Sequence, residues 1–158
     1  MIAEKKYKMQ YRYHLKNYIF KIDNCIDKEL CENTSTIEPF MEKIKDAVEK
    51  YMTEHLKYFS WFTEYSDIST VRFNKHTENE KTDLHCDLFE GDLTGSPILT
   101  VIGVLNDDYK GGNFIMFDEY EIELKQGDVI IFPSNFIYPY KVEPVTQGVR
   151  HSFISWVY

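Results

Sequence analysis

The most chemically suggestive part of the sequence is the triplet His85-Cys86-Asp87, in which two metal-ligating residue types are separated by one position. On an extended strand, side chains two residues apart point to the same face, so the imidazole and the carboxylate would converge on one small volume. With one further ligand from elsewhere, they would form the two-histidine, one-carboxylate set that leaves three neighbouring positions open on iron(II). Such a triplet also arises by chance on solvent-exposed strands, so alone it does not establish a metal site.

The elements around this triplet can be predicted from the spacing of apolar residues. From Ile37 to Leu56 apolar side chains recur with a period of roughly 3.6 residues, and Pro39 suits a first helical turn. This pattern predicts a helix with one packing face. Ahead of it we expect a strand within Tyr13–Ile22, whose residues alternate loosely, and a short helix that Asp27 caps.

After residue 58 the sequence changes to short β-prone runs that are separated by turn-forming residues such as Gly111-Gly112. Their number and spacing predict an antiparallel sandwich or barrel, with the N-terminal helix packed behind it. The predicted strands are Thr70–Asn74, Ile98–Leu105, Asn113–Phe117, Glu119–Leu124, Asp128–Phe132, Tyr138–Val142 and Arg150–Val157.

The composition predicts one folded domain in a reducing, cytoplasmic setting. The 158 residues are 43% hydrophobic and 16% aromatic, which is enough for a compact core. The formal charge of -8 disfavours polyanions, so we expect no nucleic-acid partner and no membrane partner. No apolar run approaches the ~18 residues of a membrane span, and no signal-peptide core follows Met1. The odd set of cysteines (Cys25, Cys31 and Cys86) offers no disulfide framework, and we expect Cys25 and Cys31 to be small core residues.

Several segments, taken in order, carry a family resemblance. They are His85–Asp87, Leu99–Phe114, Lys125–Ser134, Tyr138–Gly148 and Arg150–Trp156. This order resembles the prolyl 4-hydroxylase-like branch of the 2-oxoglutarate/iron(II) oxygenases, which includes small single-domain members carried by phages. The resemblance covers residues 71–158 well and residues 13–31 more loosely.

The resemblance implies a mainly β fold with N-terminal helices (α+β), namely a double-stranded β-helix, also called a jelly roll or cupin-like fold. It implies a single 2-oxoglutarate/Fe(II) dioxygenase domain over residues 1–158. Within that domain, residues 1–60 would form a helical support region and residues 61–158 the β-helix core.

Carried over residue by residue, the resemblance makes His85 and Asp87 metal ligands and places Arg150 at the basic residue that holds the far carboxylate of 2-oxoglutarate. A guanidinium suits that task because its planar fork can grip a carboxylate with two hydrogen bonds. Ser152, two residues on and on the same face, could donate another. The alternative for Arg150 is a salt-bridged arginine on an edge strand.

Three positions depart from the family pattern. Tyr140 stands where the family has its distal metal-ligating histidine, His76 stands where it often has a cosubstrate-binding tyrosine, and His151 stands where an aromatic residue often follows the basic residue. Tyrosine is not an equivalent ligand, because a phenol with a pKa near ~10 must lose its proton to bind a metal well. The resulting hard anion would favour iron(III).

Three interpretations of Tyr140 remain open. Tyr140 ligates the metal directly or leaves the position to water, which gives an impaired enzyme. Alternatively, His76 or His151 replaces the lost imidazole, or the chain no longer binds iron productively. His151 would face away from Arg150 on a strand, whereas His76 is expected beside the cosubstrate as a hydrogen-bonding residue.

The resemblance implies an oxidoreductase that uses Fe(II), 2-oxoglutarate as cosubstrate and O2, with ascorbate as reductant, and that hydroxylates a C–H bond with release of succinate and CO2. A peptide or protein substrate, with peptidyl proline as the family-level expectation, and a cytoplasmic location (the host cytoplasm if the protein is viral) follow in the same way. The alternative is an impaired or inactive 2-oxoglutarate-binding homologue, and a second alternative is a cupin-like structural domain without ligand.

Overall fold

The computed structural model describes residues 14–55, 64–89 and 95–158. The predicted amphipathic helix forms α3 (Glu38–His55), whose buried side chains are Phe40, Ile44, Ala47, Val48 and Tyr51. Their spacing places them on one face of the helix, which packs on a β-sheet. The opposite face of the helix is exposed to solvent. The short helix α2 (Lys28–Glu32) also forms, and the carboxylate of Asp27 accepts the Leu30 N–H at 2.9 Å, as a capping residue should.

The predicted strand within Tyr13–Ile22 is only partly correct. A 3-10 turn, η1 (Leu15–Tyr18), precedes a three-residue strand, β1 (Phe20–Ile22). The turn is held by α3, because the Tyr51 hydroxyl donates to the Tyr18 carbonyl at 2.9 Å and His55 Nδ1 lies 2.8 Å from the Asn17 carbonyl. These tertiary bonds take up carbonyls that a strand would offer to a neighbouring strand.

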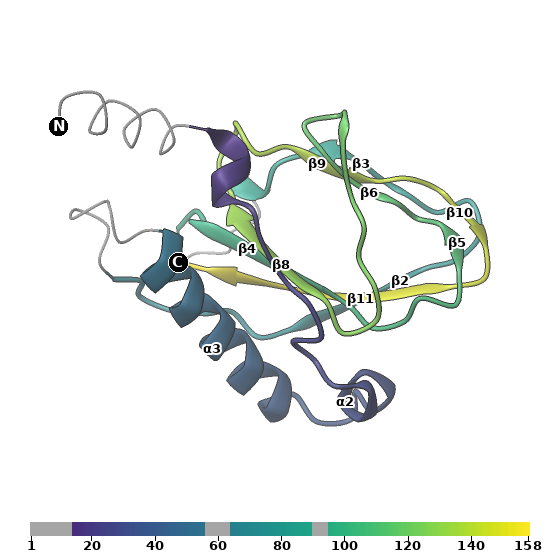
Figure 1. Ribbon diagram of the computed structural model, residues 1–158, viewed down its shortest axis with the longest axis horizontal. Coiled ribbons are helices and arrows are strands. Elements are labelled where there is room, and N and C mark those ends of the chain that lie inside the picture. Colours follow the sequence, from purple (N-terminus) through teal and green to yellow (C-terminus); the bar gives the residue numbers. More distant parts are fainter. Residues whose placement is uncertain (1–13, 56–63, 90–94) are drawn as a thin grey trace, which may run out of the picture.

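Two main antiparallel sheets face each other, and α3 covers the outer face of the larger one (Figure 1). The larger sheet has the order β1-β8-β4-β11-β2, and the smaller has the order β3-β9-β6-β7. A two-stranded ribbon, β10-β5, extends one end. The bounds are β2 (Arg72–His76), β3 (Thr82–His85), β4 (Leu99–Val104), β5 (Lys110–Gly111), β6 (Phe114–Met116), β7 (Tyr120–Ile122), β8 (Val129–Pro133), β9 (Tyr140–Val142), β10 (Val145–Gln147) and β11 (Arg150–Val157). This arrangement confirms the mainly β fold with N-terminal helices and the double-stranded β-helix.

The central strands of the larger sheet are buried on both faces. In β11, alternate residues pack towards α3 (Phe153 and Val157) or between the two sheets (Ile154 and Trp156). The same alternation runs through β4 and β8, so two apolar clusters lie on either side of one sheet. Polar side chains that point between the sheets are therefore enclosed, and this enclosed layer is where a functional site can form.

The short ribbon β10-β5 lies outside the strand predictions, since Gly111 and its neighbours are typical turn residues. The predicted strand Glu119–Leu124 shrinks to β7, because Phe117 and Asp118 adopt positive φ values of 57° and 62° and form the hairpin turn before it.

Cys31 is buried as expected, while Cys25 is half-buried. Within the described residues, no helix has both the length and the apolar character of a membrane span.

Asp128 ties β1 to the turn before β8 and provides a test of this architecture. Its buried carboxylate accepts the N–H groups of Asn24 at 3.1 Å and Lys125 at 2.9 Å and pairs with the Lys21 ammonium at 3.0 Å. Burial alone would raise the pKa of Asp128, but these hydrogen bonds and the Lys21 charge outweigh it and lower the pKa. Lys21 also pairs with the exposed Asp23, at 3.0 Å.

We predict that Asp128→Ala lowers the free energy of unfolding at pH 7 by about 2 kcal/mol, because two partly buried hydrogen bonds and the pairing of a buried carboxylate with Lys21 are lost. Since the native pKa is lowered, this contribution is complete above pH ~4 and is lost as the pH falls through the native pKa. Urea unfolding of the parent and the variant between pH 7 and pH 3 measures the difference. Asp23→Ala, which removes the exposed partner of the same lysine, should cost less than about 0.5 kcal/mol; an equal cost for both variants would contradict the assignment.

Candidate active site

His85 and Asp87 come together, but not on one extended strand as predicted. β3 ends at His85, and Asp87 begins a 3-10 turn, η2 (Asp87–Phe89). The turn still brings His85 Nε2 within 3.2 Å of Asp87 Oδ1. The predicted convergence is therefore correct, whereas the predicted strand geometry is wrong because the chain turns at Cys86 to send the carboxylate between the sheets.

Asp87 is the most constrained polar residue of the site, with 1% of its surface exposed. Its Oδ2 accepts the Thr100 hydroxyl at 2.8 Å and the Trp156 indole N–H at 3.1 Å. The Tyr140 hydroxyl lies 3.1 Å from both carboxylate oxygens. Burial alone would raise the pKa of Asp87, but hydrogen bonds from His85, Trp156 and Thr100 outweigh it and lower the pKa. The carboxylate is thus kept ionised although it is buried.

The orientation of the His85 ring suits a cation between His85 and Asp87. Nδ1 lies 2.8 Å from the Asp83 carbonyl and donates its proton to it, so Nε2 is the nitrogen that faces the carboxylate. Nε2 donates to Asp87 when it carries a second proton, and it offers a lone pair to a cation when that proton is lost. Two acceptors that face each other at 3.2 Å need a proton or a cation between them. Two ligands on adjacent positions of one octahedral ion, each about 2.1 Å away, lie roughly 3 Å apart, which matches this spacing.

Iron(II) therefore fits two protein ligands, His85 Nε2 and Asp87 Oδ1. Among the described residues, no group of three or more histidine, cysteine, aspartate or glutamate side chains could hold a metal ion. Tyr140, which the sequence places at the distal position, lies directly opposite His85 in the register of β3 and β9. Its buried ring stacks on Phe114, with centroids 5.3 Å apart, and lies 4.5 Å from the His85 ring. In this structure the Tyr140 hydroxyl donates to Asp87, and it would have to lose that proton to bind a metal well.

Arg150 lies at the start of β11 with only 2% of its surface exposed. Its Nη1 donates to the Ser152 hydroxyl at 2.9 Å, and Tyr109 lines the same cavity wall beside it. Gly112, with φ +62°, leaves room for the arginine stem, since a Cβ there would lie 3.0 Å from Arg150 Cδ. Nε is buried and has no hydrogen-bond partner in the structure. Burial lowers the pKa of this guanidinium, while Tyr109 and Tyr140 oppose the shift.

His76 faces Arg150 across the β2–β11 pairing, and the prediction that it points inward is confirmed. Its Nε2 lies 3.0 Å from the Thr82 hydroxyl, and its buried Nδ1 has no partner in the structure. Burial and the Arg150 charge both lower the pKa of His76, so the ring is neutral near pH 7. His151 is exposed and faces away from the site, as predicted.

One cavity of about 140 Å³ joins these groups. Its walls include the metal-ligand candidates His85 and Asp87, the distal-position residue Tyr140 and the guanidinium of Arg150. The full lining is Arg72, Asn74, His76, Thr82, His85, Asp87, Ile102, Phe114, Tyr140, Val142, Arg150, Ser152 and Ile154. An imidazole, a carboxylate and a guanidinium therefore share one enclosed space, as the sequence predicted.

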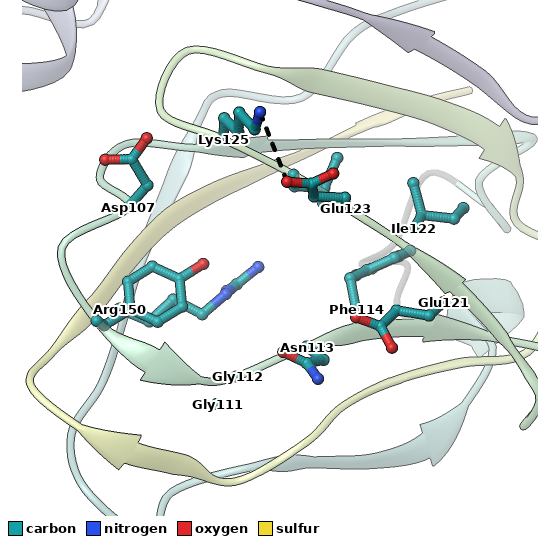
Figure 2. Close-up of a pocket in the computed structure, with 12 residues that line it drawn as sticks. Asp107, Gly111, Gly112, Asn113, Phe114, Glu121, Ile122, Glu123, Lys125 and Arg150 are labelled. Atoms are coloured by element: carbon teal, nitrogen blue, oxygen red, sulfur yellow. Dashed lines mark ion pairs between the residues drawn. The ribbon is translucent and has the colours of Figure 1, made fainter.

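A second, more open cavity of about 370 Å³ lies on the other side of Arg150. Figure 2 shows the guanidinium extending into it, between Asn113 and Glu123. Lys125 and Glu123 form an ion pair of 3.6 Å at its rim. Only the smaller cavity is lined by His85 and Asp87, so the larger one is not where metal chemistry would occur.

The sequence predictions missed three residues that hold the site together. Trp156 lies six positions after Arg150 on the same strand face, so the alternation of β11 could have indicated it. Thr100 faces inward from β4 by the same rule. Tyr109 lies in an irregular segment before β5, where no periodic signal exists.

Comparison with known proteins identifies the family of the chain. The model of the 2OG-Fe(II) oxygenase superfamily matches residues 71–158, which is more than half of the chain. The chain belongs to the 2OG-Fe(II) oxygenase superfamily.

The similar sequences are PKHD-type hydroxylases, and the similar solved structures include prolyl hydroxylases. A PKHD-type hydroxylase of Xylella fastidiosa (strain M12) is 36% identical over an alignment of 100 residues, and the match covers 54% of this chain and 43% of that protein. The viral collagen prolyl hydroxylase of Paramecium Bursaria Chlorella virus-1, solved with 2OG, has the same fold, with a TM-score of 0.70, 14% identity and coverage of 89% of this chain and 94% of that chain. A Trichoplax adhaerens prolyl hydroxylase, solved with a hypoxia inducible factor peptide fragment, has a TM-score of 0.65 and 11% identity and covers 100% of this chain and 93% of that chain.

We predict that Tyr140→His tightens Mn(II) or Fe(II) binding by about tenfold or more, because it supplies a neutral imidazole beside His85 and Asp87. Tyr140→Phe removes the same hydroxyl without adding a ligand and serves as the matched control, for which we expect no gain. Titration of metal-free protein with Mn(II), followed by electron paramagnetic resonance, measures both. Equal affinities of the parent and Tyr140→His would show that Tyr140 does not occupy the distal ligand position.

Proposed function

We propose that this protein is a 2-oxoglutarate- and Fe(II)-dependent dioxygenase of the prolyl 4-hydroxylase-like type, which hydroxylates a C–H bond with release of succinate and CO2. The observation that carries the proposal is the shared cavity, in which the His85–Asp87 pair and the buried guanidinium of Arg150 lie on the same enclosed surface. A peptide substrate, with proline as the target residue, is proposed by analogy with the viral and Trichoplax enzymes.

The residues around Arg150 suit the far carboxylate of 2-oxoglutarate. Arg150 Nε has no partner, and the Ser152 hydroxyl, which accepts from Nη1, still has its own proton to donate, so a carboxylate could accept from the guanidinium or from the serine hydroxyl. The neutral His76 can add a hydrogen bond through Nδ1 without adding a second positive charge. A carboxylate in this place would offset the cost of burying the arginine charge.

The other end of the cavity suits the metal. Iron(II) bound there would supply the oxygen chemistry that couples decarboxylation of 2-oxoglutarate to hydroxylation, with ascorbate as the reductant that maintains it. The chain itself orients the ligands, since the Asp83 carbonyl fixes the His85 ring and Thr100 and Trp156 fix one oxygen of Asp87. Apolar side chains exclude water from the space between the two ends; they are Ile102, Phe114, Val142 and Ile154.

A second candidate function is 2-oxoglutarate binding without turnover. The Tyr140 hydroxyl favours it, because this hydroxyl donates to both oxygens of Asp87 at the place where a third metal ligand is expected. The cosubstrate pocket at Arg150 does not depend on Tyr140 acting as a ligand. A protein of this kind would keep the pocket and respond to the cosubstrate without consuming it.

Thermal protection and succinate formation separate the two functions. A hundredfold excess of 2-oxoglutarate over its Kd stabilises the fold by about 2.7 kcal/mol, which raises Tm by roughly 5–10 °C for a chain of this size. We predict that Arg150→Gln abolishes this rise, since the carboxylate loses its guanidinium. His151→Gln, which changes the exposed neighbour on the opposite strand face, should retain it.

Succinate is then measured with Fe(II), ascorbate and 2-oxoglutarate, first without a substrate. Protection together with slow succinate formation supports the dioxygenase, and protection without succinate supports the binding protein. A parent protein that is not protected by 2-oxoglutarate, or an Arg150→Gln variant that is protected as well as the parent, removes Arg150 from its role and with it the proposed function.

A further inference from the structure

A second arginine lines the same cavity at the end opposite Arg150. The chain contains three arginines, of which Arg12 lies outside the described residues. The other two, Arg72 and Arg150, both line this cavity. In β2, Arg72 pairs with Ile154 and His76 pairs with Arg150. Four strand residues span roughly 13 Å, so the two guanidinium groups belong to different ends of the cavity.

Arg72 lies beside the metal end. Its guanidinium carbon is 4.8 Å from the centre of the Trp156 ring, and the indole N–H of Trp156 donates to Asp87 at 3.1 Å. The nearly buried tryptophan thus holds Arg72 above the ring face through a cation–π contact. A stacked guanidinium keeps its hydrogen-bonding edge free for a ligand in the plane of the fork.

No acidic partner accounts for Arg72. In the described part of the chain, no carboxylate lies within ion-pair distance of this side chain, which is exposed at the cavity. A positive charge left without an acidic partner at the mouth of a reaction cavity is placed to attract an anion.

We propose that Arg72 is a specificity-determining residue that binds a carboxylate of the primary substrate, so that the preferred substrate is an acidic peptide with a carboxylate near the hydroxylated position. The inference rests on the proposed function, since it takes the His85–Asp87 end of the cavity as the reaction centre. A carboxylate at Arg72 could also come from the near end of 2-oxoglutarate, because Arg150 takes only the far end. The test separates these two sources.

The probes are three heptapeptides with one central proline, flanked on both sides by glutamate, by glutamine or by lysine. Binding is measured by fluorescence anisotropy of labelled peptides on metal-free full-length chain, with and without 2-oxoglutarate, so that no turnover is needed. We expect the glutamate peptide to bind about fivefold to tenfold tighter than the glutamine peptide, between the values of an exposed ion pair and a buried charge-assisted hydrogen bond. The lysine peptide should bind weakest.

Variants of the chain test whether Arg72 causes the preference for the glutamate peptide. Arg72→Gln should remove it, and Arg72→Lys should keep only part of it, because an ammonium has the charge without the planar fork. Lys75→Gln removes one positive charge from the same strand at an exposed position that pairs with His151, and it should keep the full preference. Thermal protection by 2-oxoglutarate is measured on each variant.

Loss of the glutamate preference in Arg72→Gln, with protection by 2-oxoglutarate retained, supports the proposal. A parent that binds none of the peptides, or binds all three equally, overturns it, as does a preference that survives in Arg72→Gln. Loss of protection by 2-oxoglutarate in Arg72→Gln assigns Arg72 to the cosubstrate and also overturns it. If the parent is not protected by 2-oxoglutarate yet shows an Arg72-dependent preference, the proposed function fails while the peptide site stands.

Discussion

A buried carboxylate is the constraint on which this structure depends. Asp87 is enclosed between the two sheets and ionised, so it must receive hydrogen bonds from every side. The donors come from different strands: Thr100 from β4, Tyr140 from β9 and Trp156 from β11, with His85 at the end of β3. Satisfying one charge therefore fixes how the larger and smaller sheets face each other, and it holds the site at a defined depth between them.

The opposite charge at the other end of the cavity completes the arrangement. Arg150 is nearly as buried as Asp87, and its hydrogen bond to Ser152 leaves Nε without a partner. A buried guanidinium with an open donor and a buried carboxylate are both costly unless groups of opposite charge or hydrogen bonds satisfy them. In the proposed function an anion would satisfy Arg150, and a cation would lie between His85 and Asp87. The cavity would then take a pair of ligands rather than one.

Much of this could be predicted from the sequence, because periodicity determines which residues share a face. The alternation of β11 correctly placed Arg150 and Ser152 on one side and His151 on the other. The side chains of His85 and Asp87 lie together, although Asp87 begins a turn where a strand was predicted. Only one residue separates them, and this short separation limits how far they can diverge. What could not be predicted depends on tertiary contacts. The Tyr109 contact comes from an irregular segment, and the Tyr140 hydrogen bond depends on the register of β3 and β9.

Crystals grown with Mn(II) and 2-oxoglutarate, with anomalous scattering recorded to locate manganese, test the central claim most directly. We predict one manganese peak within bonding distance of His85 Nε2 and Asp87 Oδ1, with the far carboxylate of 2-oxoglutarate against Arg150. Manganese at a different site, or 2-oxoglutarate bound away from Arg150 or not at all, would contradict it.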